Sequence, residues 1–188
     1  ARADAVAPSL QEALQYPSLN VRGIQAAWVG DEARTIIPPR ATAEIDIRLV
    51  KESDPERLIS LIRQHIQALG FEVIDEDPSD SQRATHPKLV RMSHETSYGA
   101  FRSDFDSPAG VMARSGMRHL FGAEPILIRT MGGSIPIAPI VETLGVPAAT
   151  VPTVNIDNNQ HSPNENIRLG NFIDGIAILM AVLSQDPS

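Results

Sequence analysis

The pattern of the chain changes near residues 94–100, and this change constrains the fold more than any other feature. Before it, alternating strands and one amphipathic helix predict a small α+β layer with antiparallel strands. After it, helices and short apolar runs follow the order of a βαβ unit, whose handedness implies parallel pairing. We therefore predict two domains, residues 1–96 and residues 97–188.

The first predicted domain contains a strand whose two faces differ clearly. In residues 41–50 apolar and polar residues alternate, which places a core face opposite an open, polar face. A helix is predicted next, with Ser53 or Asp54 as N-cap, Pro55 in its first turn and Gly70 at its end. Further strands are predicted over 20–29, 71–74 and 88–92, the last two separated by the polar, turn-rich residues 75–87.

The second predicted domain is richer in helix. Ser107 and Pro108 begin one helix, which ends at Gly122. The other elements predicted here are strands over 126–128 and 148–151, helices over 137–144 and 168–183, and a polar loop over 155–165.

The charge of the chain argues against a nucleic-acid partner. Its 16 Lys and Arg against 23 Asp and Glu give a net charge of −7, and only 4% of its residues are aromatic. It therefore offers neither a basic face for phosphates nor many platforms for base stacking. No apolar run approaches the ~20 residues that span a bilayer, so we expect a soluble, cytoplasmic protein without a membrane partner. The 188 residues include no cysteine, so any metal must be bound by His and carboxylate.

Gly132, Gly133 and Ser134 stand between a predicted strand and a predicted helix. Bare backbone N–H groups at a helix start can hold an oxyanion or a carboxylate, and Ser134 can cap the helix while presenting its hydroxyl. The alternative is a tight turn that needs glycine for a positive φ angle. The spacing alone does not decide between these two interpretations.

The loop around His161 is the most polar stretch of the chain, and it follows a predicted buried strand. In open α/β sheets ligands bind at that edge. The neutral imidazole of His161 can bind a divalent metal, and nearby Asn, Asp and Glu side chains can orient it. The alternative is a solvated surface loop that contains a histidine.

Arg48 lies on the polar face of a predicted strand, where its guanidinium can grip a carboxylate through two hydrogen bonds. The alternative is that it only solvates the sheet face. We interpret His65 as a helix-packing residue and assign no role to His86, His94 and His119. No catalytic residue is identified, because the chain has no Gly-x-Ser-x-Gly elbow, phosphate loop or His-Glu-x-x-His helix.

Five short motifs resemble, in order, the second half of a known enzyme family. This family comprises the co-catalytic di-zinc peptidases that include carnosinase, glutamate carboxypeptidase, acetylornithine deacetylase and aminoacylase. The motifs are SLNVRGI (18–24), TIIP (35–38), IDIR (45–48), GGSIP (132–136) and HSPNE (161–165). Each is short, but five in the correct order with sensible spacing support the resemblance, which covers nearly everything from Pro17 onward.

The resemblance implies an α/β catalytic domain with a mixed or parallel sheet, interrupted by a smaller α+β lid domain that has an antiparallel sheet and forms a homodimer. Residues 1–96 would be part of the lid, and residues 97–188 the C-terminal part of the catalytic domain. It implies that His161 is the terminal ligand of one of two zinc ions, with Mn or Co as other possible metals. It also implies substrate-binding roles for Thr35, Arg48, Gly132, Gly133 and Ser134.

Two departures from the family pattern shape the functional prediction. Met131 stands where carnosinase-like dipeptidases have a glutamate, so a carboxylate that could pair with a free substrate amine is absent. An N-acyl amino acid then fits at least as well as a small peptide.

The second departure is that the family's His-x-Asp motif, its general-base Glu and its other metal ligands are missing from the sequence. We therefore expect a fragment of a zinc metallopeptidase or amidohydrolase, inactive alone, whose parent cleaves amide bonds through a metal-bound water. The alternative is a non-catalytic module for dimerisation and for binding small carboxylates.

Overall fold

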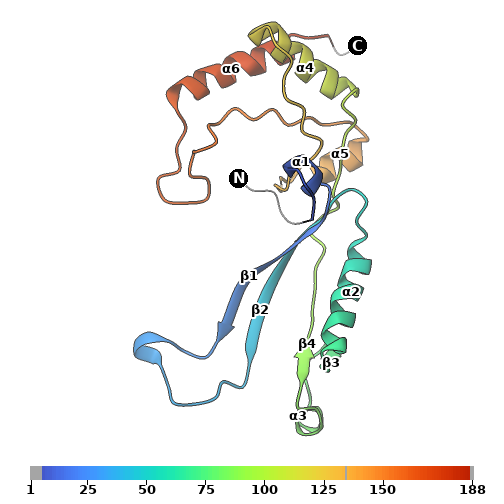
Figure 1. The fold of residues 1–188 in the computed structure, drawn as a ribbon, viewed down its shortest axis with the longest axis vertical. Helices are drawn as coiled ribbons and strands as arrows, with labels where there is room; N and C mark the ends of the chain where they lie inside the picture. Colours follow the sequence, from blue (N-terminus) through green and yellow to red (C-terminus); the bar gives the residue numbers. More distant parts are fainter. Residues whose placement is uncertain (1–5, 134, 187–188) are drawn as a thin grey trace. The chain divides into compact units, whose positions relative to one another are not determined.

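The computed structural model describes residues 6–133 and 135–186, and the chain divides into two compact units (Figure 1). The first unit is Ala1–Ala100 and the second is Phe101–Ser188. The assignment of residues 1–96 to a lid and of residues 97–188 to a catalytic domain stays a prediction, because compactness does not define what a unit does.

The first unit is built around an antiparallel pair of strands, β1 (Ser18–Ala26) and β2 (Ala41–Arg48), which Figure 1 shows side by side. A short helix, α1 (Leu10–Ala13), precedes them, and a 3-10 turn, η1 (Gly30–Glu32), lies in the loop between them. The polar face predicted for β2 is matched across the ladder by polar residues of β1. The opposite, apolar face, which the sequence predicts as core, is largely exposed.

A β-bulge at Arg22 keeps the apolar residues of β1 on one face. Val21 and Ile24 are three residues apart, so in a regular strand they would face opposite sides of the sheet. The register shifts between Val21 and Gly23, which makes Arg22 the extra residue and returns Ile24 to the face of Val21. Arg22 Nη2 then donates to Glu44 Oε2 on β2 at 2.8 Å.

Helix α2 (Pro55–Ala68) begins and ends where its sequence predicts. The carboxylate of Asp54 is the N-cap, and its Oδ1 accepts from the backbone N–H of Glu56 at 3.0 Å and of Arg57 at 3.2 Å. Gly70 follows the helix with a φ of +85°, a conformation that glycine adopts without steric cost.

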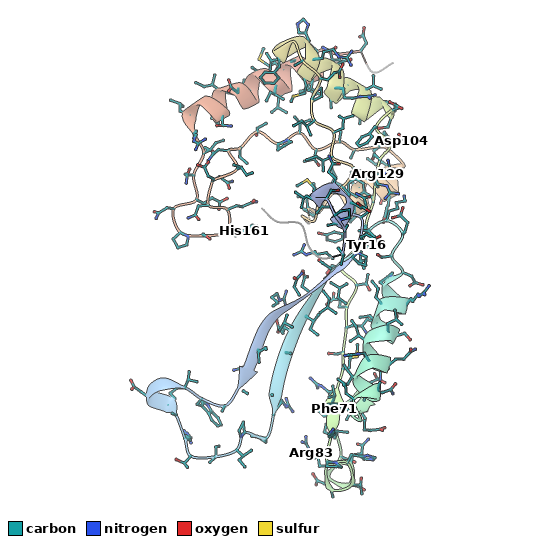
Figure 2. The ribbon with its side chains drawn as sticks, in the orientation of Figure 1. Tyr16, Phe71, Arg83, Asp104, Arg129 and His161 are labelled. Carbon is teal, nitrogen blue, oxygen red and sulfur yellow. The ribbon has the colours of Figure 1, made fainter. Side chains whose placement is uncertain are left out.

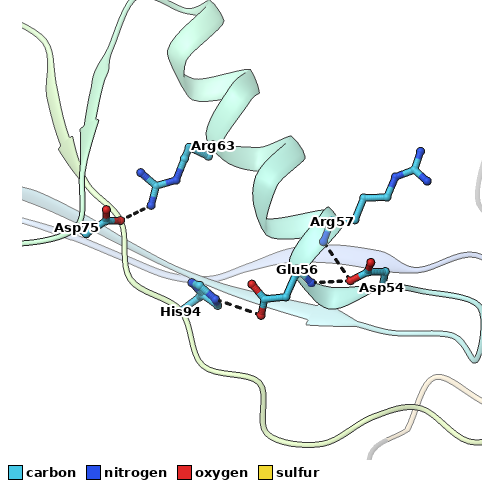
Figure 3. A network of polar contacts seen from close by, with 6 residues as sticks. All are labelled: Asp54, Glu56, Arg57, Arg63, Asp75 and His94. Atoms are coloured by element: carbon cyan, nitrogen blue, oxygen red, sulfur yellow. Dashed lines mark hydrogen bonds and ion pairs between the residues drawn. The ribbon is translucent and has the colours of Figure 1, made fainter.

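Polar contacts join α2 to the segments that follow it (Figure 3). Arg63 forms an ion pair with Asp75, and His94 Nε2 lies 3.6 Å from Glu56 Oε1. Because most of these side chains are exposed, each contact is worth about 0–1 kcal/mol. The contacts therefore orient the helix more than they stabilise it.

Strands β3 (Glu72–Ile74) and β4 (Leu89–Arg91) pair in parallel. The prediction of an antiparallel layer is therefore right for β1 with β2 and wrong for β3 with β4. The reason is helix α3 (Asp80–Thr85), which lies within residues 75–87, where the sequence predicts turns. A connection of about a dozen residues with a helix returns the chain to the start of the sheet, so the next strand runs in the same direction.

The described residues of the second unit form three helices, α4 (Pro108–Phe121), α5 (Ala138–Leu144) and α6 (Leu169–Leu183), all close to their predicted positions. Helices α4 and α6 pack against each other at Gly116. A Cβ placed on Gly116 would lie 2.6 Å from the backbone Cα of Val182, so the two backbones approach too closely for any other residue.

The strands predicted over 126–128 and 148–151 are absent from the second unit as the structure describes it. The prediction of a βαβ unit is therefore wrong for this part of the chain. An apolar run becomes a strand only when another strand satisfies its backbone N–H and C=O groups, and the two runs do not pair with each other. Instead, the N–H of Ala148 donates to Ser103 Oγ at 2.9 Å.

Few apolar side chains of the described residues are buried. The buried ones are Val73, Ala138 and Ile178. Long apolar side chains of α6 are more than half exposed, among them Leu169 at 74% and Met180 at 69%. Apolar side chains exposed to this extent on one helix are unusual for a soluble monomer.

We predict that alanine substitutions at two helical glycines have opposite effects. Gly116→Ala should lower the free energy of unfolding by about 1–3 kcal/mol, because its Cβ meets the Val182 backbone. Gly170→Ala is the matched control: nothing lies within 4 Å of its Cβ, so it should be neutral or stabilise by up to about 1 kcal/mol. Urea unfolding followed by circular dichroism measures both, and equal effects would contradict the α4–α6 contact.

We also predict that β1 tolerates the loss of its bulge. Deleting Arg22 removes the extra residue and leaves the pairs Val21–Ile45 and Ile24–Ala43 unchanged, so NOEs between Ile24 and Ala43 should remain. Deleting Asn20 instead moves the residues before it to the opposite face and should abolish the cross-strand NOE between Leu19 and Ile47. Loss of the Ile24–Ala43 NOE in the Arg22 deletion would show that Arg22 is not the extra residue of the bulge.

Candidate functional site

The polar loop of the second unit is an Ω-loop whose two ends meet between residues 155 and 168. At this neck Asn155 Oδ1 accepts from the backbone N–H of Arg168 at 3.0 Å. Further along, the N–H of Asn166 donates to the carbonyl of Asn158 at 2.9 Å. The loop is therefore closed by its own hydrogen bonds at two levels.

Asn155 is the centre of the neck. It is 5% exposed, and both ends of its side-chain amide are used. Besides accepting from Arg168, it donates through Nδ2 to Asp157 Oδ1 at 2.9 Å. Asp157 in turn forms an ion pair through Oδ2 with the Arg168 guanidinium. Three side chains thus form one network across the two ends of the loop.

This network lowers the pKa of Asp157 below its usual value. The main cause is the hydrogen bond from the Asn155 amide, which stabilises the carboxylate form, and the positive charge of Arg168 adds to it. Asp157 is therefore ionised throughout the neutral range, and its carboxylate is available as an acceptor for Asn155 and Arg168.

His161 lies at the tip of this loop, away from α6 (Figure 2). It is exposed and has a φ of 62°, and Asn159 and Asn164 on either side have φ angles of 56° and 64°. Asn and His are among the side chains that adopt this left-handed conformation most readily. The turns they form present the imidazole at the protein surface.

His161 alone does not make a metal site. Among the described residues, no group of three or more His, Asp or Glu side chains is placed to hold a metal ion. An exposed imidazole fits one position of a metal centre, but the residues present do not fit a complete one. The role of His161 as a zinc ligand stays a prediction, and no chemical step can be derived through a metal from this chain.

The glycine pair lies apart from the start of the following helix. Helix α5 begins at Ala138 with Ile137 as its N-cap, so Ile137 holds the cap position that the sequence assigns to Ser134. Ser134 itself lies outside the described residues. Gly133 does not have a positive φ, and a Cβ placed on it would meet only Met131 Cε, at 3.7 Å. Neither a turn nor a close backbone contact in this chain therefore requires glycine at this position.

The remaining candidates lie in the first unit. Arg48 stands opposite Ser18 on the polar face of β2, and its Nε contacts Asp46 Oδ2 at 2.6 Å. Thr35 is exposed in the loop between β1 and β2. The substrate-binding roles of both residues stay predictions.

The sequence predicts that Asn, Asp and Glu side chains near His161 can orient it, but it gives Arg168 no role beyond the start of a helix. Arg168 is the N-cap residue of α6, and its backbone N–H and its guanidinium both contact the neck. The one signal in the sequence is a cationic residue placed directly after a loop rich in Asn and Asp.

Comparison with known proteins identifies the class. Residues 3–73 match a model described as a peptidase dimerisation domain of the M20 family. The chain is 29% identical over 170 residues to the Cys-Gly metallodipeptidase DUG1 of Saccharomyces cerevisiae, covering 90% of this chain and 33% of that protein. It is 27% identical over 168 residues to the human Beta-Ala-His dipeptidase, covering 89% of this chain and 31% of that protein.

Solved structures agree. The S. cerevisiae dipeptidase Dug1p aligns with a TM-score of 0.70 and 26% identity, over 95% of this chain and 36% of its own. An M20 family metallo-carboxypeptidase of Sulfolobus solfataricus aligns with a TM-score of 0.68 and 26% identity, over 95% of this chain and 38% of its own.

The class that these relatives define is the metallopeptidases. Within it, the chain is similar to peptidases of the M20 family, and the resemblance indicated by the five motifs is confirmed. The chain spans about a third of the length of the curated relatives it matches. No helix among the described residues is long and apolar enough to cross a membrane.

We predict that the loop neck holds at neutral pH and opens only in acid. Because the pKa of Asp157 is lowered in the folded chain, its contribution to stability is present above about pH 3.9, the usual carboxyl value, and is lost as pH falls through the lowered pKa. The protection factor of the Arg168 amide should therefore stay constant from pH 7 to about pH 4 and fall below it. Asp174→Asn, on an exposed residue of α6, should not alter this profile, whereas a decline centred near pH 6 would contradict the network.

Proposed function

We propose that the chain is part of a longer metal-dependent peptidase or amidohydrolase that cleaves an amide bond in a small peptide or an N-acyl amino acid. The observation that carries the proposal is His161, an exposed imidazole at the tip of a closed polar loop, in a chain whose relatives are metallodipeptidases and a metallo-carboxypeptidase. Neutral imidazole is the commonest protein ligand for a metal ion.

The metal centre requires ligands from outside this chain. His161 would contribute one ligand, and the other ligands and the general base would come from the rest of the longer protein. We propose zinc as the metal, with manganese or cobalt as the alternatives that the same ligand types accept. The chain by itself should be inactive.

The first unit is proposed as the dimerisation part of this enzyme. Residues 3–73 match a peptidase dimerisation domain, and they include the β1–β2 ladder with its exposed apolar face. A two-stranded sheet with free edges and one apolar face is marginal in water alone, so pairing with a second copy would bury it. We therefore propose a homodimer formed through this unit.

The substrate groups can be assigned from three positions. Arg48 has the planar guanidinium that grips carboxylates, and Asp46 orients it from the same face of β2, which suits the carboxylate end of a peptide or an acyl amino acid. Gly133 has room for a Cβ, so a glycine there leaves space for a substrate to approach the backbone. Met131 beside it is 60% exposed and apolar, which favours an uncharged acyl group over a free amine.

We predict that His161→Ala in the longer protein lowers its bound metal and its hydrolytic rate together. Metal content by mass spectrometry of the purified protein should fall by about one ion per site, and hydrolysis of Cys-Gly, β-Ala-His and N-acetyl amino acids should fall by at least about 100-fold, since removing a metal ligand removes the metal's contribution to the reaction.

His119→Ala is the matched control, since His119 is also an exposed histidine of the second unit. It should retain both metal and activity. Unchanged metal content and activity in His161→Ala would overturn the ligand assignment. A longer protein that dimerises and binds small carboxylates, but holds no metal and cleaves none of these substrates, would favour the non-catalytic binding module instead.

A further inference from the structure

The neck of the Ω-loop contains the one buried polar side chain among the described residues, Asn155. A buried amide is costly unless both of its ends are hydrogen-bonded. Here the two ends contact opposite ends of the loop: Nδ2 reaches Asp157, and Oδ1 reaches the backbone of Arg168. The side chain therefore works only when the loop is closed.

The hydrogen bonds within the tip of the loop join exposed residues: the N–H of Ser162 donates to the carbonyl of Asn159 at 3.1 Å, and Asn159 Nδ2 donates to the carbonyl of Pro163. Asn159, His161 and Asn164 are all non-glycine residues in the left-handed conformation, which L-amino acids adopt at a cost. The tip is exposed, and no described residue of it is buried. Water competes with hydrogen bonds between exposed groups, so the part-buried network at the neck is better placed than the tip to fix how the loop presents His161.

We propose that Asn155, acting through Asp157 and Arg168, is the positioning residue that fixes where the loop presents His161. The inference rests on the proposed function, in that it gives His161 a reaction to serve. It goes beyond that function by assigning the orientation of the imidazole to three side chains that lie outside the HSPNE motif.

Asparagine suits this position because its side-chain amide carries both a hydrogen-bond donor and an acceptor. The neck needs a donor toward the Asp157 carboxylate and an acceptor toward the Arg168 N–H at the same time. Aspartate has the same shape but places an oxygen against Asp157, so two carboxylates would face each other where an N–H donor now bridges them. Asn155→Asp is therefore a nearly isosteric way to open the neck.

The structural test uses the 188-residue chain without metal. In Asn155→Asp at pH 7, the protection factors of the Arg168 amide at the neck and of the Asn166 amide, which donates to Asn158, should fall at least tenfold. The NMR signals of the His161 ring should broaden or shift. As pH is lowered toward about 5, one proton shared between the two carboxyl groups replaces the missing N–H, so protection should return.

The matched control is Asn166→Asp, the same substitution at an exposed position of the same loop. It removes only the bond from Asn166 Nδ2 to the carbonyl of Asn164 at 2.9 Å, so protection at the neck, read at the Arg168 amide, should stay within twofold of the original chain. Amide protection in α4 shows whether either variant unfolds the unit as a whole.

The functional test uses the longer protein. Asn155→Asp should lower kcat for the dipeptide or acyl substrate at least tenfold with less than a threefold change in KM, because the substrate contacts remain while the imidazole is misplaced. Asn166→Asp should change neither constant by more than threefold.

The outcomes separate this inference from the proposed function. Neck protection and His161 signals in Asn155→Asp that match those of Asn166→Asp would overturn the positioning role, whatever His161→Ala does. A loosened loop with an unchanged kcat would overturn it as well, while leaving the hydrolase proposal standing. A His161→Ala variant with unchanged metal content and activity would instead overturn the proposed function. The reaction that the positioning serves would be lost with it.

Discussion

The small apolar core is the constraint on which the rest of the structure depends. With few buried side chains, the described residues cannot be held by the hydrophobic effect in the way a complete domain of this length is. Order comes instead from a few specific contacts: the Asp54 cap of α2, the amide of Asn155 and the backbone contact between Gly116 and Val182. The first two act over a short stretch of chain and the third joins two helices, so the elements are well formed although much apolar surface remains exposed.

This balance of forces also explains which elements could be predicted from the sequence. Helices α2, α4 and α6 and the strands β1 and β2 carry their own signals in caps, glycine ends and alternation, so local pattern found them. The apolar runs over 126–128 and 148–151 could not be assigned from local signals, because a strand forms only with a partner strand and a short apolar run does not specify one. The parallel direction of β4 depends on α3. The Ser79–Gln82 capping box signals the start of this helix, but it lies in a polar segment where the sequence predicts turns.

The residues of the candidate site also differ in whether the sequence signals them. His161 could be proposed from the sequence because imidazole in a polar loop is a recognisable chemical signal, and its role stays a prediction. Asn155 and Arg168 are ordinary residues whose importance arises only from being brought together, with one side chain buried and the other placed at the start of α6. The sequence gives little signal for such residues, and their hydrogen bonds are seen only when the loop is closed.

The self-contained neck has a consequence for how such a protein can change. Because both ends of the Ω-loop are joined by side chains within the loop and at the first residue of the next helix, its interior can vary in length and sequence without disturbing α4 or α6. The loop is in this sense an exchangeable unit: a tip taken from another protein could be grafted between residues 158 and 166, which would leave Asn155, Asp157 and Arg168 in place.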